Sequence, residues 1–366
     1  MHRAAVWAIV AATLALAAAA TPARAQAPPG PIPPPAHIQE PPKATLRVKV
    51  EWVSTPVTVR NSKGELDLTL GEKDFRVFQD GIEQKIEHFD VGGDPLSIVI
   101  VVETSSRVEP LLPAVRATGI LFSQDVMPGD VQAAIVSYDD TTNLIQEFTS
   151  SGEAIERAMN HLPEGLSGAA LFDALSRGVD MLSRQPRERR RVILAMAEPV
   201  DTGSETKLGE VLRAAQLQNV TIYSVGLSTT AAELRAEARE HPSAYPPGIS
   251  PMPGPPGIAQ TPSTVQIENT SADLGAAVIW AVQHVKEKVK DNYLEVAGAA
   301  TGGEHLAAFK DRTIGKAVSQ IAGELHAEYT LGYQPIAGSE PGFHKINVTV
   351  DRAGMKVRAR PGYYLE

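Results

Sequence analysis

Two glutamates stand where buried strands are expected to end, and they are the residues best suited to chemistry. Glu103 follows the apolar run at 96–102 (LSIVIVV), and Glu198 follows the run at 191–196 (RVILAM). Two carboxylates that face each other across a substrate can act as general acid and general base, as in glycoside hydrolysis. One alternative interpretation is therefore a hydrolase that uses Glu103 and Glu198, which would require a deep pocket between the strand ends.

Other catalytic signals are absent from the sequence. It contains no glycine-rich phosphate loop, no nucleophile elbow and no His-Glu-x-x-His segment. The chain has no cysteine, which excludes thiolate chemistry, and its nine histidines are scattered without ligand spacing. Asp139 and Asp140 fall in an expected turn, where aspartate usually makes local hydrogen bonds. Asp173, at a helix start, is expected to be a structural hydrogen-bond partner rather than a ligand. We therefore predict that the protein is not an enzyme.

The elements that position the glutamates alternate between strands and helices. The apolar runs at 96–102, 191–196 and 220–226 are typical of strands buried on both faces of a parallel sheet. A strand at 131–138 is expected to form a hairpin with 143–148, and 304–309 is a possible edge strand. Amphipathic segments predict helices at 111–122, 153–162, 169–182, 207–218, 274–290 and 313–328. This order predicts an α/β fold over 95–328, with a doubly wound, mostly parallel central sheet flanked by helices.

Segments of alternating polarity flank this region on both sides. Residues 45–94 form an expected N-terminal β module with a hairpin turn at Asp80-Gly81, and 329–366 form a C-terminal β segment. Chain termini often lie close together in a domain. We therefore predict that the two segments pair as an antiparallel β-sandwich with the α/β domain inserted between them.

The N-terminus has the pattern of an export signal. Residues 1–25 combine a basic start, an Ala/Leu-rich run and a small-x-small site, which predicts cleavage between Ala25 and Gln26. A Pro-rich linker follows at 26–44, and a Pro/Gly-rich surface insertion is expected at 241–262. Together with the absence of cysteine, this pattern favours a periplasmic or secreted bacterial protein.

The charge of the chain limits its partners. Cleavage of the signal peptide would change the formal net charge from −9 to −11, because two arginines and no acidic residue are lost. A strongly acidic chain is not expected to bind nucleic acid or an anionic membrane surface. No other segment is long and apolar enough for membrane insertion after cleavage.

Three segments follow one another along the chain at 103–107 (ETSSR), 167–174 (SGAALFDA) and 192–201 (VILAMAEPVD). In this order they resemble the Asp-x-Ser-x-Ser loop, the Gly-Thr-Ala-Leu-Tyr-Asp-Ala segment and the strand with Thr-Asp-Gly-x-Asp of von Willebrand factor type A (vWA) domains. Further segments resemble exported bacterial proteins described as VWFA-related, namely DFRVFQDGIEQKIEHF, ATGGEHLAAF, ELHAEYTLGYQP and KVRARPGYY. The resemblance covers roughly residues 45 to 366 and implies the α/β fold predicted above.

The resemblance also implies a metal-ion-dependent adhesion site, here in degenerate form. The family supplies an Asp, two Ser, a Thr and a second Asp as oxygen ligands for a hard divalent cation. At these positions the chain has Glu103, Ser105, Arg107, Ala169 and Glu198. One hydroxyl of three remains, and a guanidinium repels a cation but pairs well with a carboxylate. We predict that no cofactor binds and that Arg107 stands in for the metal through an ion pair with Glu103 or Glu198.

A weak Mg²⁺ or Ca²⁺ site remains an alternative. Its ligands would be Glu103, Ser105, Glu198 and Asp201, and the resemblance aligns Asp201 with the second downstream Asp of the family. Arg107 would then point into solvent.

The family implies a function in protein binding, commonly through a partner carboxylate. The partner-binding residues implied here are Glu103, Ser105, Arg107, Ala169, Glu198 and Asp201. With the metal lost, Arg107 could receive the carboxylate with two parallel hydrogen bonds. We predict an exported, non-enzymatic protein-interaction module with an unknown protein partner and an undetermined oligomeric state. The alternative is a structural or assembly component of the cell envelope.

Overall fold

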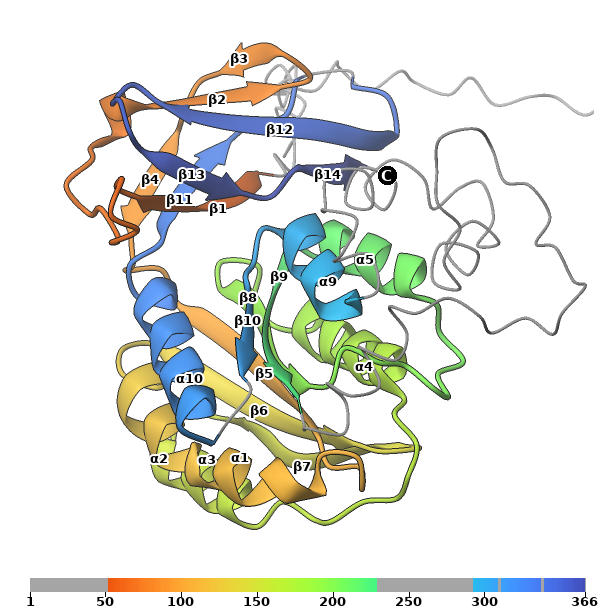
Figure 1. Ribbon diagram of the computed structural model, residues 1–366. Coiled ribbons are helices and arrows are strands. Elements are labelled where there is room, and N and C mark those ends of the chain that lie inside the picture. The colour runs from red at the N-terminus through yellow and green to blue at the C-terminus, as the bar shows by residue number, and fades with distance from the viewer. Residues whose placement is uncertain (1–51, 229–291, 309–310, 337–338, 366) are drawn as a thin grey trace, which may run out of the picture. The chain divides into compact units, whose positions relative to one another are not determined.

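The computed structural model describes residues 52–228, 292–308, 311–336 and 339–365 (Figure 1). The expected signal peptide, the Pro-rich linker, the insertion at 241–262 and the helix at 274–290 lie outside these described residues. Within the described part, no helix has the length and apolar character needed to cross a bilayer.

A six-stranded sheet forms the centre of the α/β domain, in the order β10-β9-β8-β5-β6-β7. Neighbouring strands are parallel except for β7, which pairs antiparallel with β6. Every residue of β5, β8 and β9 is buried, which is expected for strands covered on both faces. The prediction of a mostly parallel sheet flanked by helices is confirmed. The strands are β5 (Leu96–Glu103), β6 (Val131–Tyr138), β7 (Thr142–Thr149), β8 (Arg190–Ala197), β9 (Val220–Leu227) and β10 (His305–Ala308).

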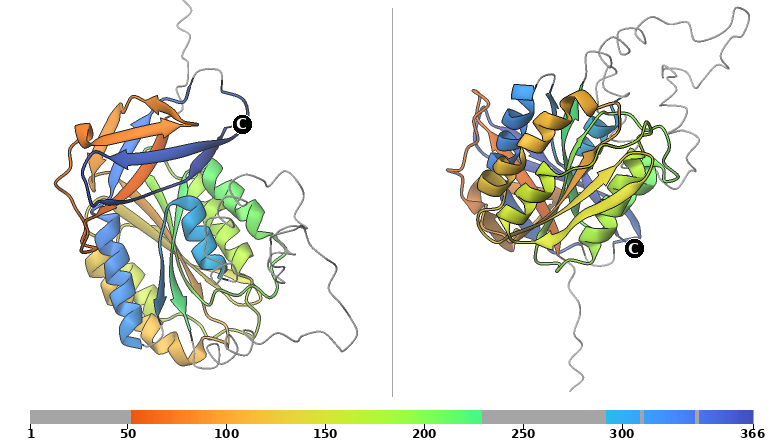
Figure 2. Two further views of the ribbon diagram at one scale, coloured as in Figure 1. Left: turned by 45° about the horizontal axis from the view of Figure 1, so that its top comes forward. Right: turned by 90° about the horizontal axis from the view of Figure 1, so that it is seen from below.

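Helices cover the two faces of this sheet (Figures 1 and 2). Because side chains alternate along a strand, Ile98 and Ile100 of β5 pack on one face and Val99 and Val101 on the other. Strand β5 is therefore a central strand, and Glu103 is its last residue. The first face carries α1 (Leu112–Ala117), α3 (Gly152–Asn160) and α10 (Asp311–Leu325), and the second carries α4 (Leu171–Ser183), α5 (Leu208–Leu217) and α9 (Tyr293–Thr301).

The helix predicted at 111–122 is wrong as a single element. The segment forms short pieces: the Thr118 hydroxyl donates to the Val115 carbonyl at 2.6 Å where α1 ends, and the backbone continues as a π-turn after residue 121. Gly119 packs closely against α3, since a Cβ there would lie 3.0 Å from the Glu156 carbonyl oxygen. The pieces are a 3₁₀ turn (Glu109–Leu111), α1, α2 (Gly119–Leu121) and the π-turn (Phe122–Val126).

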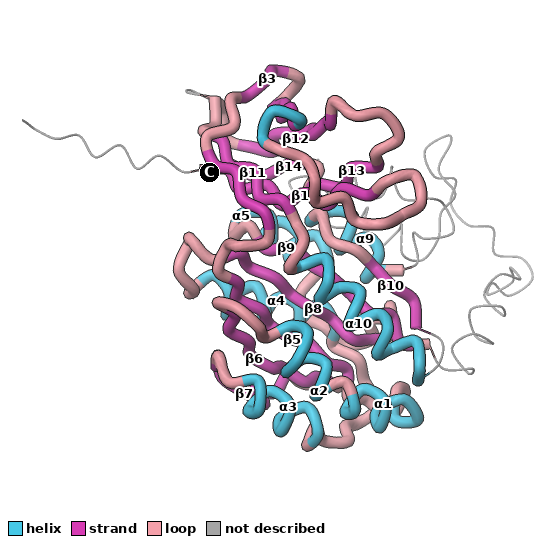
Figure 3. Tube along the Cα trace, turned by 90° about the vertical axis from the view of Figure 1, so that its left-hand side faces the viewer, coloured by secondary structure: helices cyan, strands magenta, loops and turns pink. Residues whose placement is uncertain are grey.

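An antiparallel β module combines strands from both ends of the described chain (Figure 3). One sheet has the order β13-β1-β11-β4 and the other β14-β12-β2-β3. Each joins N-terminal to C-terminal strands, since β1 pairs with β11 and β13 while β2 pairs with β12. The sheets share one apolar core that includes Val57, Val77 and Tyr329. We call these strands the terminal β module: β1 (Val53–Arg60), β2 (Phe75–Gln79, after a 3₁₀ turn at Glu72–Asp74), β3 (Ile82–Gln84), β4 (His88–Val91), β11 (Tyr329–Tyr333), β12 (Gly342–Val350), β13 (Lys356–Ala359) and β14 (Gly362–Leu365).

Buried ion pairs lie where the chain passes from the α/β domain into the module. Arg190 at the start of β8 pairs with Glu328 just before β11, and both side chains are almost fully buried. The Tyr223 hydroxyl donates to Glu328 at 3.2 Å. On the same side, Glu324 of α10 pairs with Arg358 of β13. Loss of one partner of a buried ion pair strongly destabilises a fold. These contacts therefore link the α/β domain to the terminal β module.

Candidate functional site

The two glutamates come from the ends of neighbouring parallel strands. Strands β5 and β8 pair in register up to Val102 and Met196, one and two residues before Glu103 and Glu198. The carboxyl ends of parallel strands meet at one edge of the sheet, where ligands bind in doubly wound folds. The loop at 104–108 follows β5 at this edge and carries Ser105 and Arg107.

Glu103 is completely buried and accepts hydrogen bonds at both carboxylate oxygens. The Ser105 hydroxyl donates to Oε1 at 2.6 Å, and the backbone N–H of Glu198 donates to Oε2 at 2.7 Å. The Tyr138 hydroxyl lies 3.4 Å from Oε2. Burial is the largest influence and raises the pKa of Glu103 to about 7, although the bonds from Ser105 and Glu198 and the charge of Arg107 lower it.

Arg107 forms its ion pair with Glu198 rather than with Glu103. Its Nε donates to Glu198 Oε2 at 2.8 Å, and the Glu198 side chain is 2% exposed while that of Arg107 is 22% exposed. The backbone N–H of Arg107 also donates to Ser105 Oγ at 3.3 Å. Among the described residues, none accepts a hydrogen bond from the Nη groups of Arg107. The guanidinium is thus fixed at Nε and reaches the surface.

Ala169 and Asp201 lie in a second group, held together by backbone contacts. Ala169 donates its N–H to Thr202 Oγ1 at 3.0 Å and accepts from the Thr202 N–H at 2.9 Å. Asp201 Oδ1 accepts from the Phe172 N–H at 3.1 Å and from Ser204 Oγ at 2.6 Å. Burial raises the pKa of Asp201. Both residues therefore fix the start of α4. The sequence analysis did not identify Thr202 as a residue of this group, and its position next to Asp201 was the one signal that could have indicated it.

Asp139 and Asp173 make structural hydrogen bonds, of which those of Asp139 to Thr141 are local and the others reach residues distant in sequence. Asp139 Oδ1 accepts from the Thr141 N–H at 2.9 Å, and Oδ2 accepts from the Leu166 N–H at 2.9 Å. Burial acts to raise the pKa of Asp139, but these bonds outweigh it and the pKa is lowered. Asp173 accepts from the backbone N–H groups of Glu205 and Thr206. Asp140 is exposed at the same turn.

The groups that would ligate a divalent cation at this edge are engaged by other partners. Both oxygens of Glu103 accept hydrogen bonds, and one of the donors is the hydroxyl of Ser105, the one hydroxyl that remains of the implied ligand set. Glu198 is engaged by a guanidinium, whose positive charge repels a second cation. Within the described part of the chain, no three His, Asp or Glu side chains are grouped as metal ligands.

Burial corrects the set of residues expected to contact a partner. Glu103, Ser105, Ala169 and Glu198 are at most 1% exposed, so a partner cannot touch them in this conformation. Arg107 and the half-buried Asp201 are the two of the six that reach the surface.

An exposed apolar residue belongs to a loop that is hydrogen-bonded to the Arg107 loop. Leu166 is 66% exposed, and its carbonyl accepts from the N–H of Ser106, the residue before Arg107, at 2.8 Å. The sequence analysis did not select Leu166, since a single leucine in a loop carries no pattern.

A serine and a histidine in contact elsewhere do not form a nucleophile pair. His305 Nδ1 lies 2.8 Å from Ser224 Oγ, and Nε2 lies 3.0 Å from the amide nitrogen of Asn292. Asn292 uses its oxygen to accept from the Glu295 N–H, so its amide group donates to Nε2 and the ring proton must sit on Nδ1. His305 therefore donates to Ser224 and cannot act as its base. Ser224 is also completely buried.

Comparisons with known proteins give distant structural likeness alone. No family model matches the chain, and no curated protein matches it. The structure is similar to the conserved hypothetical protein BatB from Bacteroides thetaiotaomicron, at 11% identity over 63% of this chain and 98% of that chain, with a TM-score of 0.38.

Two further solved structures are similar at the same level. One is the vWF domain of the type V pili tip protein Mfa5 from Porphyromonas gingivalis, at 11% identity over 63% of this chain and 95% of that chain, with a TM-score of 0.40. The other is an aerotolerance-related membrane protein from Bacteroides fragilis, at 12% identity over 63% and 99%, with a TM-score of 0.38. Because the identities and TM-scores of these three structures are low, the fold assignment rests on the strand order described above. The family of the chain is a proposal.

Proposed function

We propose that this chain is an exported protein-interaction module related to vWA domains, in which Arg107 takes the place of the metal ion. The proposal rests on the order of the three vWA-like segments and on their meeting near the carboxyl ends of β5 and β8. It holds that the chain is not an enzyme and uses no cation or other cofactor. Its location in the periplasm or outside the cell follows from the signal peptide expected at 1–25.

The observation that carries the proposal is the attachment of Arg107. Its Nε donates to the buried carboxylate of Glu198, and this contact orients the planar guanidinium. A guanidinium held at Nε can still offer its Nη groups to a carboxylate, with both charge and fixed geometry. The loop that carries Leu166, which is 66% exposed, is joined to the Arg107 loop by the backbone hydrogen bond from Ser106 to the Leu166 carbonyl. The surface therefore suits a protein partner that presents an acidic side chain beside an apolar one.

Affinity capture from an envelope extract tests this surface. Two variants remove it in different ways: Arg107→Ala removes the guanidinium, and Leu166→Asp adds a competing carboxylate at an exposed position. The matched control is Arg184→Ala, because Arg184 is 73% exposed and pairs with Asp180 on α4. We expect both site variants to lose a partner that wild type and Arg184→Ala retain. Equal recovery with all four folded proteins would refute the proposal.

A structural or assembly role in the envelope is the second candidate. It is favoured by the burial of Glu103, Ser105 and Glu198. Because these side chains form hydrogen bonds within the protein, they can stabilise the fold without contacting a partner. Under this alternative Arg107→Ala would lower stability and leave partner recovery unchanged. A hydrolase that uses Glu103 and Glu198 is the least supported, since both carboxylates are buried and engaged by internal donors.

A further inference from the structure

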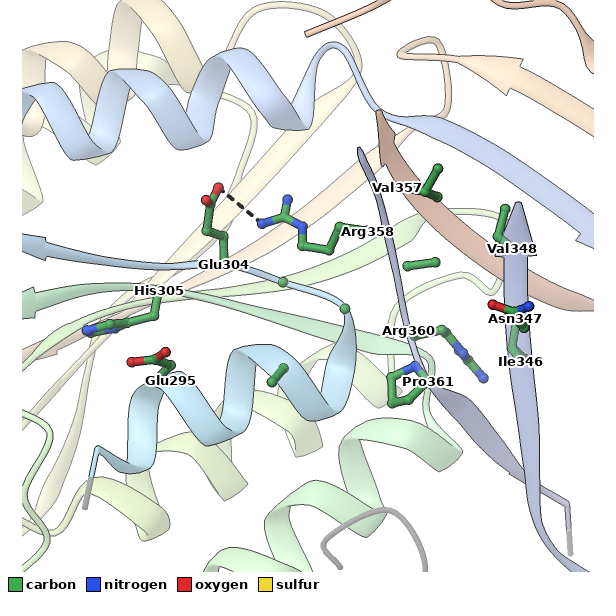
Figure 4. Close-up of a pocket in the computed structure, with 14 residues that line it drawn as sticks. Glu295, Glu304, His305, Ile346, Asn347, Val348, Val357, Arg358, Arg360 and Pro361 are labelled. Atoms are coloured by element: carbon green, nitrogen blue, oxygen red, sulfur yellow. Dashed lines mark ion pairs between the residues drawn. The ribbon is translucent and has the colours of Figure 1, made fainter. Parts of the chain in front are cut away.

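A cleft of about 560 Å³ lies between the α/β domain and the terminal β module (Figure 4). Helix α9 and the start of β10 form one wall, and strands β12 and β13 with the residues after β13 form the other. The volume falls in the range of pockets that bind small molecules, about 300–1,000 Å³. Two segments that take no part in the Arg107 site line it, from ATGGEHLAAF and KVRARPGYY.

This cleft is separate from the Arg107 surface. Arg360, on its wall, donates to the side chain of Asn219, the residue before β9. The cleft therefore adjoins the amino end of a parallel strand. Arg107 follows the carboxyl end of β5, at the opposite edge of the sheet.

Arg360 is a buried cation without a carboxylate partner in the described part of the chain. The residue is 5% exposed, its Nε donates to the Gly362 carbonyl at 3.0 Å, and its Nη1 donates to Asn219 Oδ1 at 2.5 Å. Its Nη2 is buried and makes no hydrogen bond with the described residues. Burial lowers the pKa of Arg360 to about 10. A buried donor without a partner is unfavourable and often marks the place of a bound water or ion.

The other charges on the cleft do not neutralise Arg360, whose guanidinium lies over the Tyr363 ring at 5.7 Å from its centroid. Glu304 is neutralised by Arg358, whose Nη1 lies 3.1 Å from Glu304 Oε2. Burial lowers the pKa of His305 to about 4, so its ring is uncharged at neutral pH. The remaining acidic residue, Glu295, is drawn in Figure 4 near His305 and apart from Arg360. An anion bound at Arg360, which is 5% exposed, would therefore lie away from both carboxylates.

The wall next to Arg360 is apolar. Ile346 and Val348 of β12 and Val357 of β13 line the cleft, and Pro361 follows Arg360. Apolar walls with a few placed polar groups are typical of small-ligand sites. We propose that this cleft binds a small organic acid, whose carboxylate pairs with the guanidinium of Arg360 and whose apolar body contacts Ile346, Val348 and Val357. The site is independent of the function proposed for Arg107.

Titration calorimetry with three probes tests the ligand class. The probes are hexanoate, which has charge and an apolar body, 1-hexanol, which has the body alone, and inorganic phosphate, which has charge alone. We expect saturable millimolar binding of hexanoate, at least about tenfold tighter than that of 1-hexanol, because the charge-assisted bond is lost with the alcohol. Equal binding of the alcohol, tighter binding of phosphate, or no saturation by hexanoate would each overturn the proposal.

Variants locate the binding. Arg360→Gln should abolish hexanoate binding, and Asn347→Asp provides a second test that leaves the Arg360 hydrogen bonds in place. Asn347 is an exposed residue on the same wall, so an added carboxylate there should weaken hexanoate binding by about three- to tenfold. Asn143→Asp on β7 is the matched control for added charge, and Arg107→Ala is the control for the other site. Both controls should bind as wild type does, and an Asn347→Asp protein that binds like Asn143→Asp would contradict the assignment.

Discussion

Removal of the Arg107 side chain should destabilise the fold more than the loss of a surface charge does. Arg107→Ala leaves the carboxylate of Glu198, 2% exposed, without its cation. Breaking a fully buried ion pair in this way costs about 3–5 kcal/mol. Because the Arg107 side chain is 22% exposed and water already reaches it, we expect a smaller loss of about 2–3 kcal/mol in the free energy of unfolding.

Glu198→Gln should have a smaller effect, since Arg107 can be solvated once its partner is neutral. The loss of one charge-assisted hydrogen bond predicts about 1 kcal/mol. The double variant Arg107→Ala with Glu198→Gln leaves no buried charge, so its stability should lie near that of Glu198→Gln. Urea unfolding of the four proteins should then give a coupling free energy of about 2–3 kcal/mol. A coupling below about 0.5 kcal/mol, typical of exposed pairs, would refute this account of Arg107.

Two further predictions concern a buried acid and a glycine. The pKa of Glu103 is about 7 in the folded protein and 4.5 in the unfolded chain, so between these pH values the folded state holds a proton that the unfolded state has lost. The free energy of unfolding should therefore fall as the pH rises from 4.5 to 7, by up to about 3 kcal/mol. Glu103→Gln should remove this dependence in urea unfolding at pH 5 and pH 8, and an unchanged pH profile would contradict the burial argument. Gly302→Ala should lower the free energy of unfolding by about 2–4 kcal/mol, because Gly302 has φ +85° and a Cβ would lie 2.7 Å from the backbone nitrogen of Arg360. Gly203→Ala is the control, because no atom lies within 4 Å of a Cβ at Gly203, and it should change the stability measured by thermal unfolding by less than about 0.5 kcal/mol. Equal losses of stability in the two variants would count against the close approach of Gly302 to Arg360.

The fold of the α/β domain was largely predictable because its strands carry a simple signal. The continuous apolar runs at 96–102, 191–196 and 220–226 correspond to β5, β8 and β9, in which every residue is buried. The hairpin of β6 with β7 and the edge strand β10 were also predicted. Periodicity did not predict the breaks after Ala117, because they depend on contacts with α3 and α10 that are distant in sequence.

The candidate site was predictable in its positions and less so in its exposure. The resemblance brought Glu103, Ser105, Arg107 and Glu198 together, and these four residues make direct contacts. The sequence could not show that three of them are buried, since their burial depends on the neighbouring loops, including the one that carries Leu166. Arg360 had no distinguishing pattern either, because only the assembled module and sheet show that none of the described carboxylates pairs with it.

Titration calorimetry with MgCl₂ and CaCl₂ tests most directly whether Arg107 replaces the metal. The comparison is between wild type and a variant that restores the implied family ligands, Glu103→Asp, Arg107→Ser, Ala169→Thr and Glu198→Asp together. We predict no saturable sub-millimolar binding to wild type, and binding of at least one of the two ions to the restored variant. Sub-millimolar binding of either ion to wild type would contradict the replacement of the metal by Arg107.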